Sequence, residues 1–347
     1  MHDRIDKLAA QAIRDGAFTG AEILFACGEQ LLLHRAYGRT SPEAHARPLK
    51  TGRTWDLASL TKPLATGAAI LALYEDGALG LDDKASKYLP EWVLGKKISL
   101  TDLLTHRSGL PDWLPLYQEK DPWAALMSVE PLGPVGVKVV YSCLNFLILG
   151  EVVRRVSKQS LEQYCQTRLY RPLGLESLAF NPGPRPEVLE TAFCLWRRRL
   201  LLGEVHDENA GAFGGEGGNA GLFGNAMDLW GFAKMLLAGG SLNGVQVFKP
   251  DTVALMLKNH NPASLAPRAL AWDYYKPDGN YWSCGNRMNE GSFGHLGYTG
   301  TSLWVDPKAG WIVISLSHRV QIGREETQAQ IRAFRPELCN LLIESKL

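Results

Sequence analysis

Ser59 and Lys62 are the first residues in the chain whose types and spacing fit a catalytic role. Residues three apart lie on one face of a helix, so the Lys62 ammonium group can reach the Ser59 hydroxyl group. Pro63 fits the first helical turn, which places Ser59 beside a helix N-terminus, where the dipole favours negative charge. However, 18 serines and 16 lysines in 347 residues yield about 0.8 such pairs by chance, so the pair alone is weak evidence.

Two further motifs strengthen the interpretation of Ser59. Tyr141-Ser142-Cys143-Leu144-Asn145 begins an apolar stretch that ends at Gly150 and is typical of a helix. His295-Leu296-Gly297-Tyr298-Thr299-Gly300-Thr301 leads directly into a predicted C-terminal hairpin. All three motifs contain residue types that serve nucleophilic catalysis and proton transfer.

The order Ser-x-x-Lys, Tyr-Ser-x-x-Asn and His-x-Gly before a strand resembles the serine β-lactamase and penicillin-binding-protein superfamily. The closer likeness is to its class C branch and to the related esterases and D-amino-acid peptidases. The stretches LLTHRSGLP, GEVHDENA, GLFGNAMDL and GYTGTSLWVDP are also similar to that family. The resemblance extends from about Gly20 to about Arg319, most of the chain, and implies both a fold and a serine-hydrolase activity.

The resemblance implies that Ser59 is the nucleophile and forms an acyl-enzyme that water later hydrolyses. Serine needs a base at neutral pH, and Lys62 and Tyr141 are the candidates, one as proton acceptor and the other tuning it. A cation about 4 Å from a tyrosine contributes roughly 4 kcal/mol at an effective dielectric constant of about 20. That lowers the tyrosine pKa by up to about 3 units from about 10, enough for a tyrosinate near neutral pH. A desolvated, neutral Lys62 serves equally well, so the base stays open.

The third motif presents His295 where the family normally presents a lysine. A histidine with a pKa near about 6.5 is only partly charged at neutral pH, so it anchors a substrate carboxylate weakly. This points towards neutral acyl esters or weakly charged amides as substrates. By resemblance, the backbone N–H groups of Ser59 and Tyr298 form the oxyanion hole, and Gly297 lets the strand approach the substrate closely.

Cys143 departs from the family pattern, because the position two after the tyrosine is often an asparagine whose amide holds the acyl side chain of the substrate. A thiol is a poor hydrogen-bond partner. Asn145 lies four residues after Tyr141, on the same face of a helix, and either supplies the missing amide or makes a structural contact. We expect both residues near the substrate, with Cys143 tuning specificity or reducing activity.

The elements that position these motifs follow from the spacing of apolar residues. Residues 2–15 read as a helix with one apolar face, and Gly16 is a natural terminator. A hairpin follows, with strands at Ala21–Ala26 and Leu31–Tyr37 on either side of Gly28. Four more helical segments are predicted at Pro63–Tyr74, Leu100–Thr105, Tyr141–Val156 and Met227–Ala238.

The C-terminal part of the chain contains a second hairpin, with strands at Thr301–Val305 and Trp311–Ser317. A final helix is expected from about Glu325, with Pro336 kinking or restarting it. Strands therefore lie at both ends of the chain, and helices lie between them.

This arrangement predicts an α+β fold of the β-lactamase/transpeptidase-like kind, which the resemblance also implies. An antiparallel sheet is built from both chain ends and flanked by helices, and a mainly helical lobe is inserted. We expect residues 1–75 and 240–347 to form the sheet lobe and residues 76–239 to form the helical lobe. The cleft between the two lobes is the expected place of the active site.

The overall composition excludes several classes of protein. With 46% hydrophobic and 21% charged residues, the chain is not intrinsically disordered. A formal net charge of +1 provides no long-range field for nucleic acid or a membrane surface, and no apolar stretch is long enough to span a bilayer. The N-terminus lacks a signal-peptide pattern, and the six cysteines read as reduced thiols, so we expect a cytoplasmic protein.

Other motifs receive structural or accidental interpretations. His206-Asp207 has no second histidine nearby, so we expect it to brace the glycine-rich loop that follows and predict no metal site. Gly215-x-Gly217-x-x-Ala220 follows no apolar strand, so no dinucleotide or other cofactor is predicted. Gly-x-Ser-x-Gly does not occur, which disfavours an α/β-hydrolase. Arg197-Arg198-Arg199 is interpreted as a solvated face rather than a nucleic-acid site.

The leading functional hypothesis is a serine hydrolase that forms an acyl-enzyme on Ser59, of the esterase type acting on small acyl esters or amides. β-Lactamase, D,D-carboxypeptidase or D-aminopeptidase activity ranks second, because those substrates normally lie outside the cytoplasm. A non-catalytic member of the family that uses the cleft for binding is the third hypothesis. The expected partner is a small-molecule acyl substrate, and the sequence predicts neither the deacylation base nor the oligomeric state.

Overall fold

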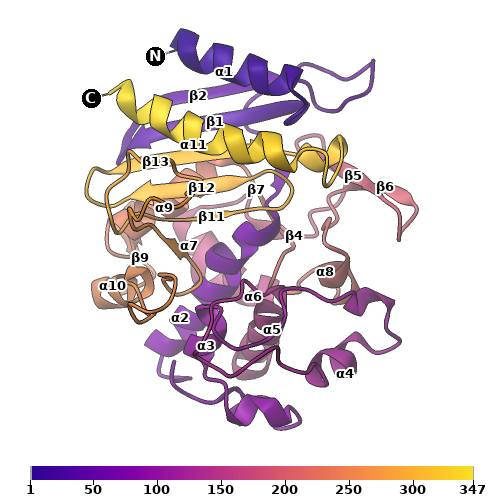
Figure 1. Cartoon of the computed structure of the whole chain (residues 1–347), viewed down its shortest axis with the longest axis vertical. Helices are drawn as coiled ribbons and strands as arrows, with labels where there is room; N and C mark the ends of the chain where they lie inside the picture. The colour runs from indigo at the N-terminus through magenta and orange to yellow at the C-terminus, as the bar shows by residue number, and fades with distance from the viewer. Residues whose placement is uncertain (1, 347) are drawn as a thin grey trace.

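A six-stranded antiparallel sheet forms one layer of the computed structural model, which describes residues 2–346 (Figure 1). The N-terminal hairpin pairs with the last strand of the chain, so that Ala21 lies opposite Ser317 and Cys27 lies opposite Trp311. The strands are, in spatial order, β10 (Asp273–Tyr274), β11 (Phe293–Leu296), β12 (Ser302–Asp306), β13 (Trp311–Ser317), β1 (Gly20–Cys27) and β2 (Gln30–Gly38). The prediction of an antiparallel sheet built from both chain ends is confirmed.

The outer face of this sheet is covered by the two terminal helices, α1 (His2–Arg14) and α11 (Gln328–Glu344), which contact each other (Figure 1). Both helices bury apolar side chains against the sheet, in a cluster that includes Phe18, Trp304 and Phe334. The predicted helix at residues 2–15 is therefore confirmed, and Gly16 follows it with φ of +75°, a conformation that glycine adopts at low cost.

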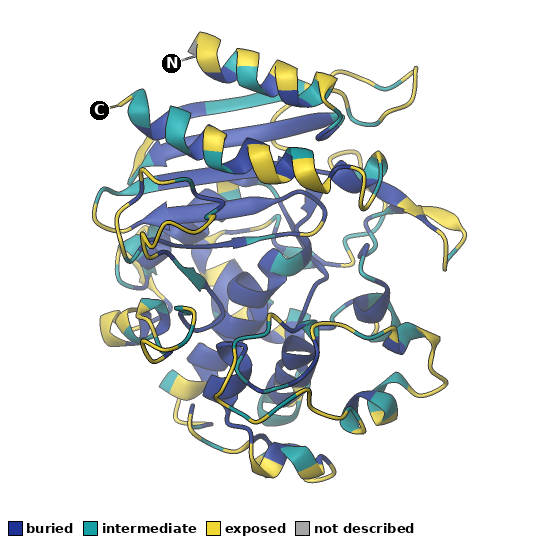
Figure 2. Ribbon diagram, viewed as in Figure 1, coloured by how far each residue is buried: buried dark blue, intermediate teal, exposed yellow. Residues whose placement is uncertain are grey.

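The inner face of the sheet packs against a mainly helical region. Its helices are α2 (Ala68–Glu75), α3 (Leu100–Leu104), α4 (Pro122–Met127), α5 (Cys143–Ser157), α6 (Leu161–Cys165), α7 (Arg171–Leu173), α8 (Glu208–Ala212), α9 (Ala226–Leu237) and α10 (Pro250–Leu257). Its short strands are β3 (Trp55–Asp56), β4 (Ala179–Phe180), β5 (Glu190–Cys194), β6 (Arg199–Leu202), β7 (Leu222–Gly224), β8 (Ser241–Leu242) and β9 (Val245–Gln246). Figure 2 shows that the buried residues concentrate between the sheet and these helices. The lobe boundaries at 75/76 and 239/240 stay a prediction.

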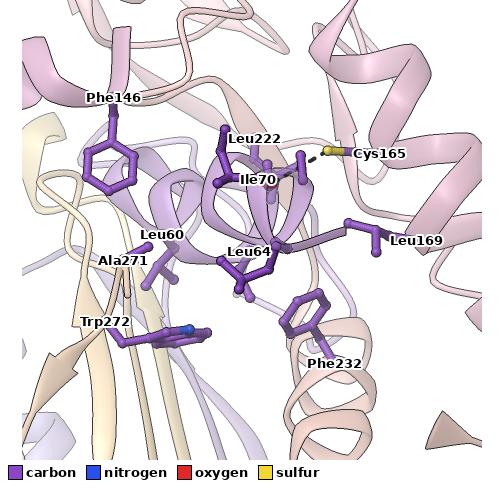
Figure 3. Close-up of a cluster of buried hydrophobic side chains, with 14 of the residues drawn as sticks. Leu60, Leu64, Ile70, Phe146, Cys165, Leu169, Leu222, Phe232, Ala271 and Trp272 are labelled. Atoms are coloured by element: carbon purple, nitrogen blue, oxygen red, sulfur yellow. Dashed lines mark hydrogen bonds between the residues drawn. The ribbon is translucent and has the colours of Figure 1, made fainter. Parts of the chain in front are cut away.

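The helical segment after Ser59 runs through the middle of the apolar core. A short 3₁₀ turn (Ala58–Leu60) leads into a π-helical stretch (Lys62–Gly67), which continues as α2. Figure 3 shows Leu60, Leu64 and Ile70 of this segment surrounded by buried side chains from α5, α6, α9 and β7 and from the segment before β10. Because apolar contacts enclose the segment, the position of Ser59 at its start is fixed by the core.

The last helix continues through Pro336, although a proline normally breaks a helix. Proline lacks the N–H group that would bond to the carbonyl oxygen four residues earlier, which belongs to Arg332. That oxygen instead accepts a hydrogen bond of 2.8 Å from the Tyr281 hydroxyl group. Of the two predicted effects of Pro336, a restart of the helix is wrong, because a side chain from outside the helix replaces the missing donor; a kink stays a prediction.

Helix α5 begins at Cys143, two residues later than predicted, and leaves Tyr141 outside the helix. The other predicted helices and strands around the motifs are present with small shifts of their ends. No helix in residues 2–346 is long and apolar enough to cross a membrane.

Candidate active site

A cavity of about 650 Å³ opens where the end of β11 meets the helical region. Six of the predicted site residues line it: Ser59, Tyr141, Cys143, His295, Gly297 and Tyr298. Lys62 lies beneath the cavity wall and is fully buried. The structure therefore brings together three motifs that are spread over more than two hundred residues of the chain.

Ser59 follows a residue in an unusual backbone conformation. Ala58 has φ of +48°, a region that costs energy for any residue with a side chain. The buried Asp56 carboxylate holds this turn, because its Oδ1 accepts a hydrogen bond of 2.9 Å from the Ala58 N–H group. On the far side of the turn, the Thr61 hydroxyl group donates to the Ala58 carbonyl oxygen at 2.6 Å. The strained turn presents Ser59 to the cavity.

Lys62 contacts the Ser59 hydroxyl group directly, as the three-residue spacing predicts. Its Nζ atom lies 2.9 Å from Ser59 Oγ, 2.8 Å from the Asn219 carbonyl oxygen and 3.6 Å from Cys143 Sγ. The N–H donors of the ammonium group therefore point to partners inside the protein. Lys62 is not exposed to solvent, so these partners replace water around its charge.

Tyr141 lies next to this pair, with the Lys62 Nζ atom 5.1 Å from the centre of its ring. Although 39% of the residue is exposed, its hydroxyl group interacts with both Ser59 and Lys62. Burial of the hydroxyl raises the pKa of Tyr141 above its ordinary value, and the opposing effect of the Lys62 ammonium is smaller. The predicted lowering of the Tyr141 pKa is therefore wrong for the free enzyme, because the cost of burying a phenolate exceeds the attraction of one cation.

The pKa of Lys62 depends on the same buried neighbours. Burial lowers the pKa of Lys62, but interactions with Cys143 and Tyr141 outweigh burial and leave the pKa above its ordinary value. Ser59, Lys62 and Tyr141 therefore share one cluster in which the positions of the protons are coupled. Whichever of Lys62 and Tyr141 has lost its own proton can accept the proton of Ser59.

Cys143 and Asn145 have different positions. Cys143 forms part of the cavity wall and contacts the Lys62 ammonium group. Asn145 is fully buried, and its amide is used inside the protein: Oδ1 accepts from the Ser108 hydroxyl group at 2.7 Å, and Nδ2 donates to the Leu103 carbonyl oxygen at 3.2 Å. Asn145 is absent from the cavity wall, so it makes the structural contact rather than supplying an amide to substrate. The argument from a shared helix face is wrong, because Tyr141 precedes the helix.

His295 is neutral rather than partly charged. Its pKa is lowered to about 4, mainly because the ring is buried; Asp273 opposes this effect, and the Lys62 and Arg268 cations add to it. Its Nδ1 atom lies 2.8 Å from the Leu296 carbonyl oxygen, which accepts only, so Nδ1 carries the proton. The buried Nε2 atom has no partner among the described residues and offers a lone pair. His295 therefore presents a hydrogen-bond acceptor, where the sequence predicts a weak cation.

The neutral His295 predicts how substrate preference depends on pH. We expect the ratio of kcat/KM for a succinyl ester to kcat/KM for a butyryl ester to stay constant from about pH 8 to about pH 5.5. The ratio cancels ionisations that affect both substrates, such as that of Asp56, whose pKa burial raises to about 7. Because the folded protein favours neutral His295, its stabilising effect is also lost only as the pH falls from about 6.5 towards 4. A rise of the ratio centred near about pH 6.5 would show a charged His295 instead.

Gly297 and Tyr298 form the turn that faces Ser59. A side chain at Gly297 would place its first carbon 2.6 Å from the Leu57 carbonyl oxygen and against Thr301, so only glycine fits. The need for glycine arises from contact with the turn before Ser59, in addition to any approach of substrate. The Tyr298 N–H group donates to no other group in residues 2–346, and Arg319 fixes the peptide by donating to the Tyr298 carbonyl oxygen at 2.9 Å.

Asp56 is a site residue that the sequence analysis missed. Besides Ala58, its carboxylate accepts a hydrogen bond of 2.6 Å from the His206 N–H group, and its carbonyl oxygen accepts from the Thr299 hydroxyl group at 2.8 Å. One buried residue thus connects the Ser59 turn, the loop at His206 and the turn after Tyr298. The signal in the sequence is an acidic residue inside an apolar segment three positions before the serine.

Asp207 braces the glycine-rich loop, as predicted, whereas His206 donates its backbone N–H to Asp56. Asp207 caps α8 by accepting from the Ala210 N–H group at 2.7 Å, and it accepts from the Asn219 side-chain amide at 3.1 Å. The backbone carbonyl oxygen of Asn219 in turn accepts a hydrogen bond from the Lys62 ammonium group. Both His206 and Asp207 also line the cavity, which the sequence analysis did not predict. No group of three His, Cys, Asp or Glu side chains suited to a metal ion occurs within residues 2–346.

Comparison with known proteins decides what kind of protein carries this site. The profile of the family described as Beta-lactamase matches residues 5–334, nearly the whole chain. The chain belongs to the β-lactamase family. It is a serine hydrolase of the β-lactamase and penicillin-binding-protein superfamily, which confirms the resemblance seen in the motifs.

Within the β-lactamase family, two curated relatives cover most of the chain. An N-acetylmuramyl-L-alanine amidase of Bacillus subtilis (strain 168) is 31% identical over 346 residues, which span 88% of this chain and 78% of the relative. A protein of Escherichia coli (strain K12), provisionally named D-alanyl-D-alanine carboxypeptidase, is 30% identical over 362 residues, which span 91% of this chain and 82% of the relative.

A solved structure shows the same fold. The octameric penicillin-binding protein homologue from Pyrococcus abyssi superposes with a TM-score of 0.75 and 18% sequence identity. The match covers 99% of this chain and 77% of that chain. The β-lactamase/transpeptidase-like α+β fold predicted from the motifs is therefore confirmed.

Proposed function

We propose that this family member hydrolyses small acyl esters and amides through an acyl-enzyme on Ser59. The observation that supports this most strongly is the 2.9 Å contact between Lys62 Nζ and Ser59 Oγ at the base of the cavity. Ser59 Oγ forms a bond to the acyl carbon, and its proton passes to the deprotonated member of the pair Lys62 and Tyr141, either a neutral Lys62 amine or a Tyr141 phenolate. The bond to the leaving group breaks, and that group receives the proton. Water then hydrolyses the Ser59 ester and restores the free enzyme.

The backbone N–H groups of Ser59 and Tyr298 are the proposed oxyanion hole. Developing negative charge on the acyl oxygen needs donors that are held in place before the reaction. The Ser59 turn is held by Asp56, and the Tyr298 peptide is held by Arg319. The cavity therefore offers two rigid segments, one on each side of the position that an acyl carbon would occupy.

Esters of small, weakly charged acids rank first among the substrates. The neutral His295 presents no cation to a substrate carboxylate, and Cys143 presents no amide to an acyl side chain. The alcohol of an ester is also a better leaving group than the amine of an amide, whose nitrogen must be protonated as the bond breaks. The six cysteines are all free thiols, which fits the proposed cytoplasmic location.

Hydrolysis of a peptide or peptidoglycan amide is the second candidate, as a D,D-carboxypeptidase, D-aminopeptidase or amidase. Two observations favour this candidate. The two relatives are named as an amidase and a carboxypeptidase. The cavity wall also contains Arg319, Arg324 and Arg335, and an arginine cation can bind the carboxylate of a peptide. Arg324 pairs with Glu208, but Arg335 is buried with its Nε atom unpartnered among the described residues. A β-lactam is the third candidate substrate.

A substrate panel separates these candidates. We expect p-nitrophenyl acetate and butyrate to be hydrolysed with a kcat/KM at least about tenfold above that for diacetyl-Lys-D-Ala-D-Ala or nitrocefin. A preference for the D-Ala-D-Ala peptide would favour the peptidase, and a preference for nitrocefin would favour the β-lactamase. Ser59→Ala, measured with each substrate, is the control for contaminating activity.

Replacing Tyr141 by phenylalanine removes one proton carrier and leaves the ring in place. The ring packs against His106 at 4.6 Å between centroids, and phenylalanine keeps this contact, so we expect unchanged thermal unfolding. We expect Tyr141→Phe to lower kcat/KM by about 10²-fold or more. A value near that of the wild type would remove the Tyr141 hydroxyl group from the mechanism.

A further inference from the structure

The hairpin of β5 and β6 exposes an apolar face to solvent. The two strands pair only with each other, and the hairpin projects from the edge of the molecule (Figure 1). Phe193 and Leu200 lie opposite each other in the register, and they are 59% and 47% exposed. Cys194, the next residue on β5, is fully buried. Alternation along a strand normally directs polar side chains outward, so an outward apolar pair needs an explanation.

The apolar surface continues around the tip of this hairpin. Leu195 is 84% exposed and Trp196 is 42% exposed, which makes the tip one of the most exposed apolar segments of the protein (Figure 2). A single exposed leucine is ordinary in a folded protein, but four neighbouring large apolar side chains on a projecting hairpin indicate an interaction surface.

The same tip is basic. From residue 191 to residue 203 the sequence contains three arginines and no acidic residue. Arg197 stacks on the Trp196 ring at 5.0 Å and donates to the Val205 carbonyl oxygen at 2.8 Å. Arg198 is exposed at the turn, and Arg199 is exposed and pairs with Glu204. The prediction that these arginines face solvent is therefore confirmed for Arg198 and Arg199, whereas Arg197 is partly buried.

Aromatic rings link the hairpin to the mouth of the cavity. Trp196 contacts Tyr117 with ring centroids 5.1 Å apart, and Tyr117 contacts Trp113 with centroids 6.3 Å apart. Trp113 lines the cavity. Whatever covers the hairpin therefore also lies beside the entrance to the site.

We propose that the β5–β6 hairpin docks on an anionic lipid surface. Exposed leucine, phenylalanine and tryptophan side chains enter the interfacial region of a bilayer, while flanking arginines bind lipid phosphates. A symmetric contact with a second copy would place the arginines of the two tips against each other, which disfavours self-association. The net charge of +1 excludes recruitment of the whole molecule over long range, but a local basic tip acts at contact distance.

Vesicle sedimentation tests this proposal with the full chain. We expect binding to phosphatidylcholine vesicles that contain phosphatidylglycerol to exceed binding to phosphatidylcholine alone by at least about tenfold, and to weaken at high salt. Leu195→Ser combined with Phe193→Ser, and separately Arg198→Glu, should reduce the bound fraction to the level of pure phosphatidylcholine. Leu132→Ser, at another exposed leucine far from the hairpin in the chain, is the matched control and should bind like the wild type.

Two further measurements decide the outcome. Hydrolysis of a soluble ester should be unchanged in all these variants, which shows that they fold. Equal binding of the wild type and the hairpin variants would overturn the proposal. So would a wild-type dimer in solution that the hairpin variants abolish, because it would assign the surface to a second copy of this chain.

Discussion

Replacing Ser59 by alanine is expected to abolish turnover, with kcat/KM reduced by at least about 10⁴-fold. The Ser59 hydroxyl group is the only proposed nucleophile. Lys62 and the turn at Ala58 are arranged around this hydroxyl group. The left-handed backbone of Ala58 and the buried ammonium group of Lys62 each cost folding free energy. Costs of this kind are typical of a functional site. Steady-state hydrolysis of p-nitrophenyl butyrate measures the effect.

Folding must be intact for this result to bear on catalysis. The Ser59 hydroxyl group interacts with Lys62 and Tyr141 at the cavity wall and is not part of the apolar core, so its loss leaves that core untouched. We expect Ser59→Ala to unfold at the temperature of the wild type. Ser128→Ala, which removes a hydroxyl group from an exposed helix end, is the matched control and should retain full activity. Residual turnover in Ser59→Ala above the rate of the Lys62 variants would point to another nucleophile.

Replacing Lys62 by methionine is expected to lower kcat/KM by about 10²- to 10⁴-fold. Methionine keeps an unbranched side chain of similar length, but it cannot donate to Ser59 Oγ or the Asn219 carbonyl oxygen. The serine then loses both its cation and a proton acceptor. We expect the rate of reaction with a fluorophosphonate to fall in parallel, because acylation itself is impaired.

Lys62→Arg separates the two roles that Lys62 can play. Arginine keeps a positive charge but does not give up its proton in proteins. If Lys62 acts as the proton acceptor, Lys62→Arg should be as slow as Lys62→Met. If Lys62 instead tunes Tyr141 as the acceptor, Lys62→Arg should retain part of the activity. Near-wild-type activity of both variants would remove Lys62 from the mechanism.

The fold was predictable wherever the sequence pattern is local. The amphipathic helix before Gly16, the hairpin around Gly28 and the C-terminal hairpin are set by apolar spacing and turn residues within a few positions. Ser59 and Lys62 belong to this class, because their contact depends on one helical turn. The overall order of the motifs then identified the family and, through it, the sheet made from both ends.

The sequence-based predictions that were wrong concern features that depend on contacts between distant segments. Pro336 remains inside a helix because the Tyr281 hydroxyl group donates to the Arg332 carbonyl oxygen, which lies 51 residues further along the chain. The pKa values of Tyr141 and His295 depend on complete burial of their polar atoms, which no spacing reveals. Asp56 was missed because three of its four partners, His206, Thr299 and His318, come from distant segments, and only the folded chain brings them to this one residue.

The most direct test of this account is the mass of the intact wild-type protein after reaction with acylating probes. We expect incubation with a fluorophosphonate, and with a slowly hydrolysed ester, to add one probe mass, and peptide mapping to place it on Ser59. Mapping distinguishes Ser59 from Cys143, the other nucleophilic side chain in the cavity wall. Absence of an adduct with every probe, or an adduct that persists unchanged in Ser59→Ala, would contradict an acyl-enzyme on Ser59.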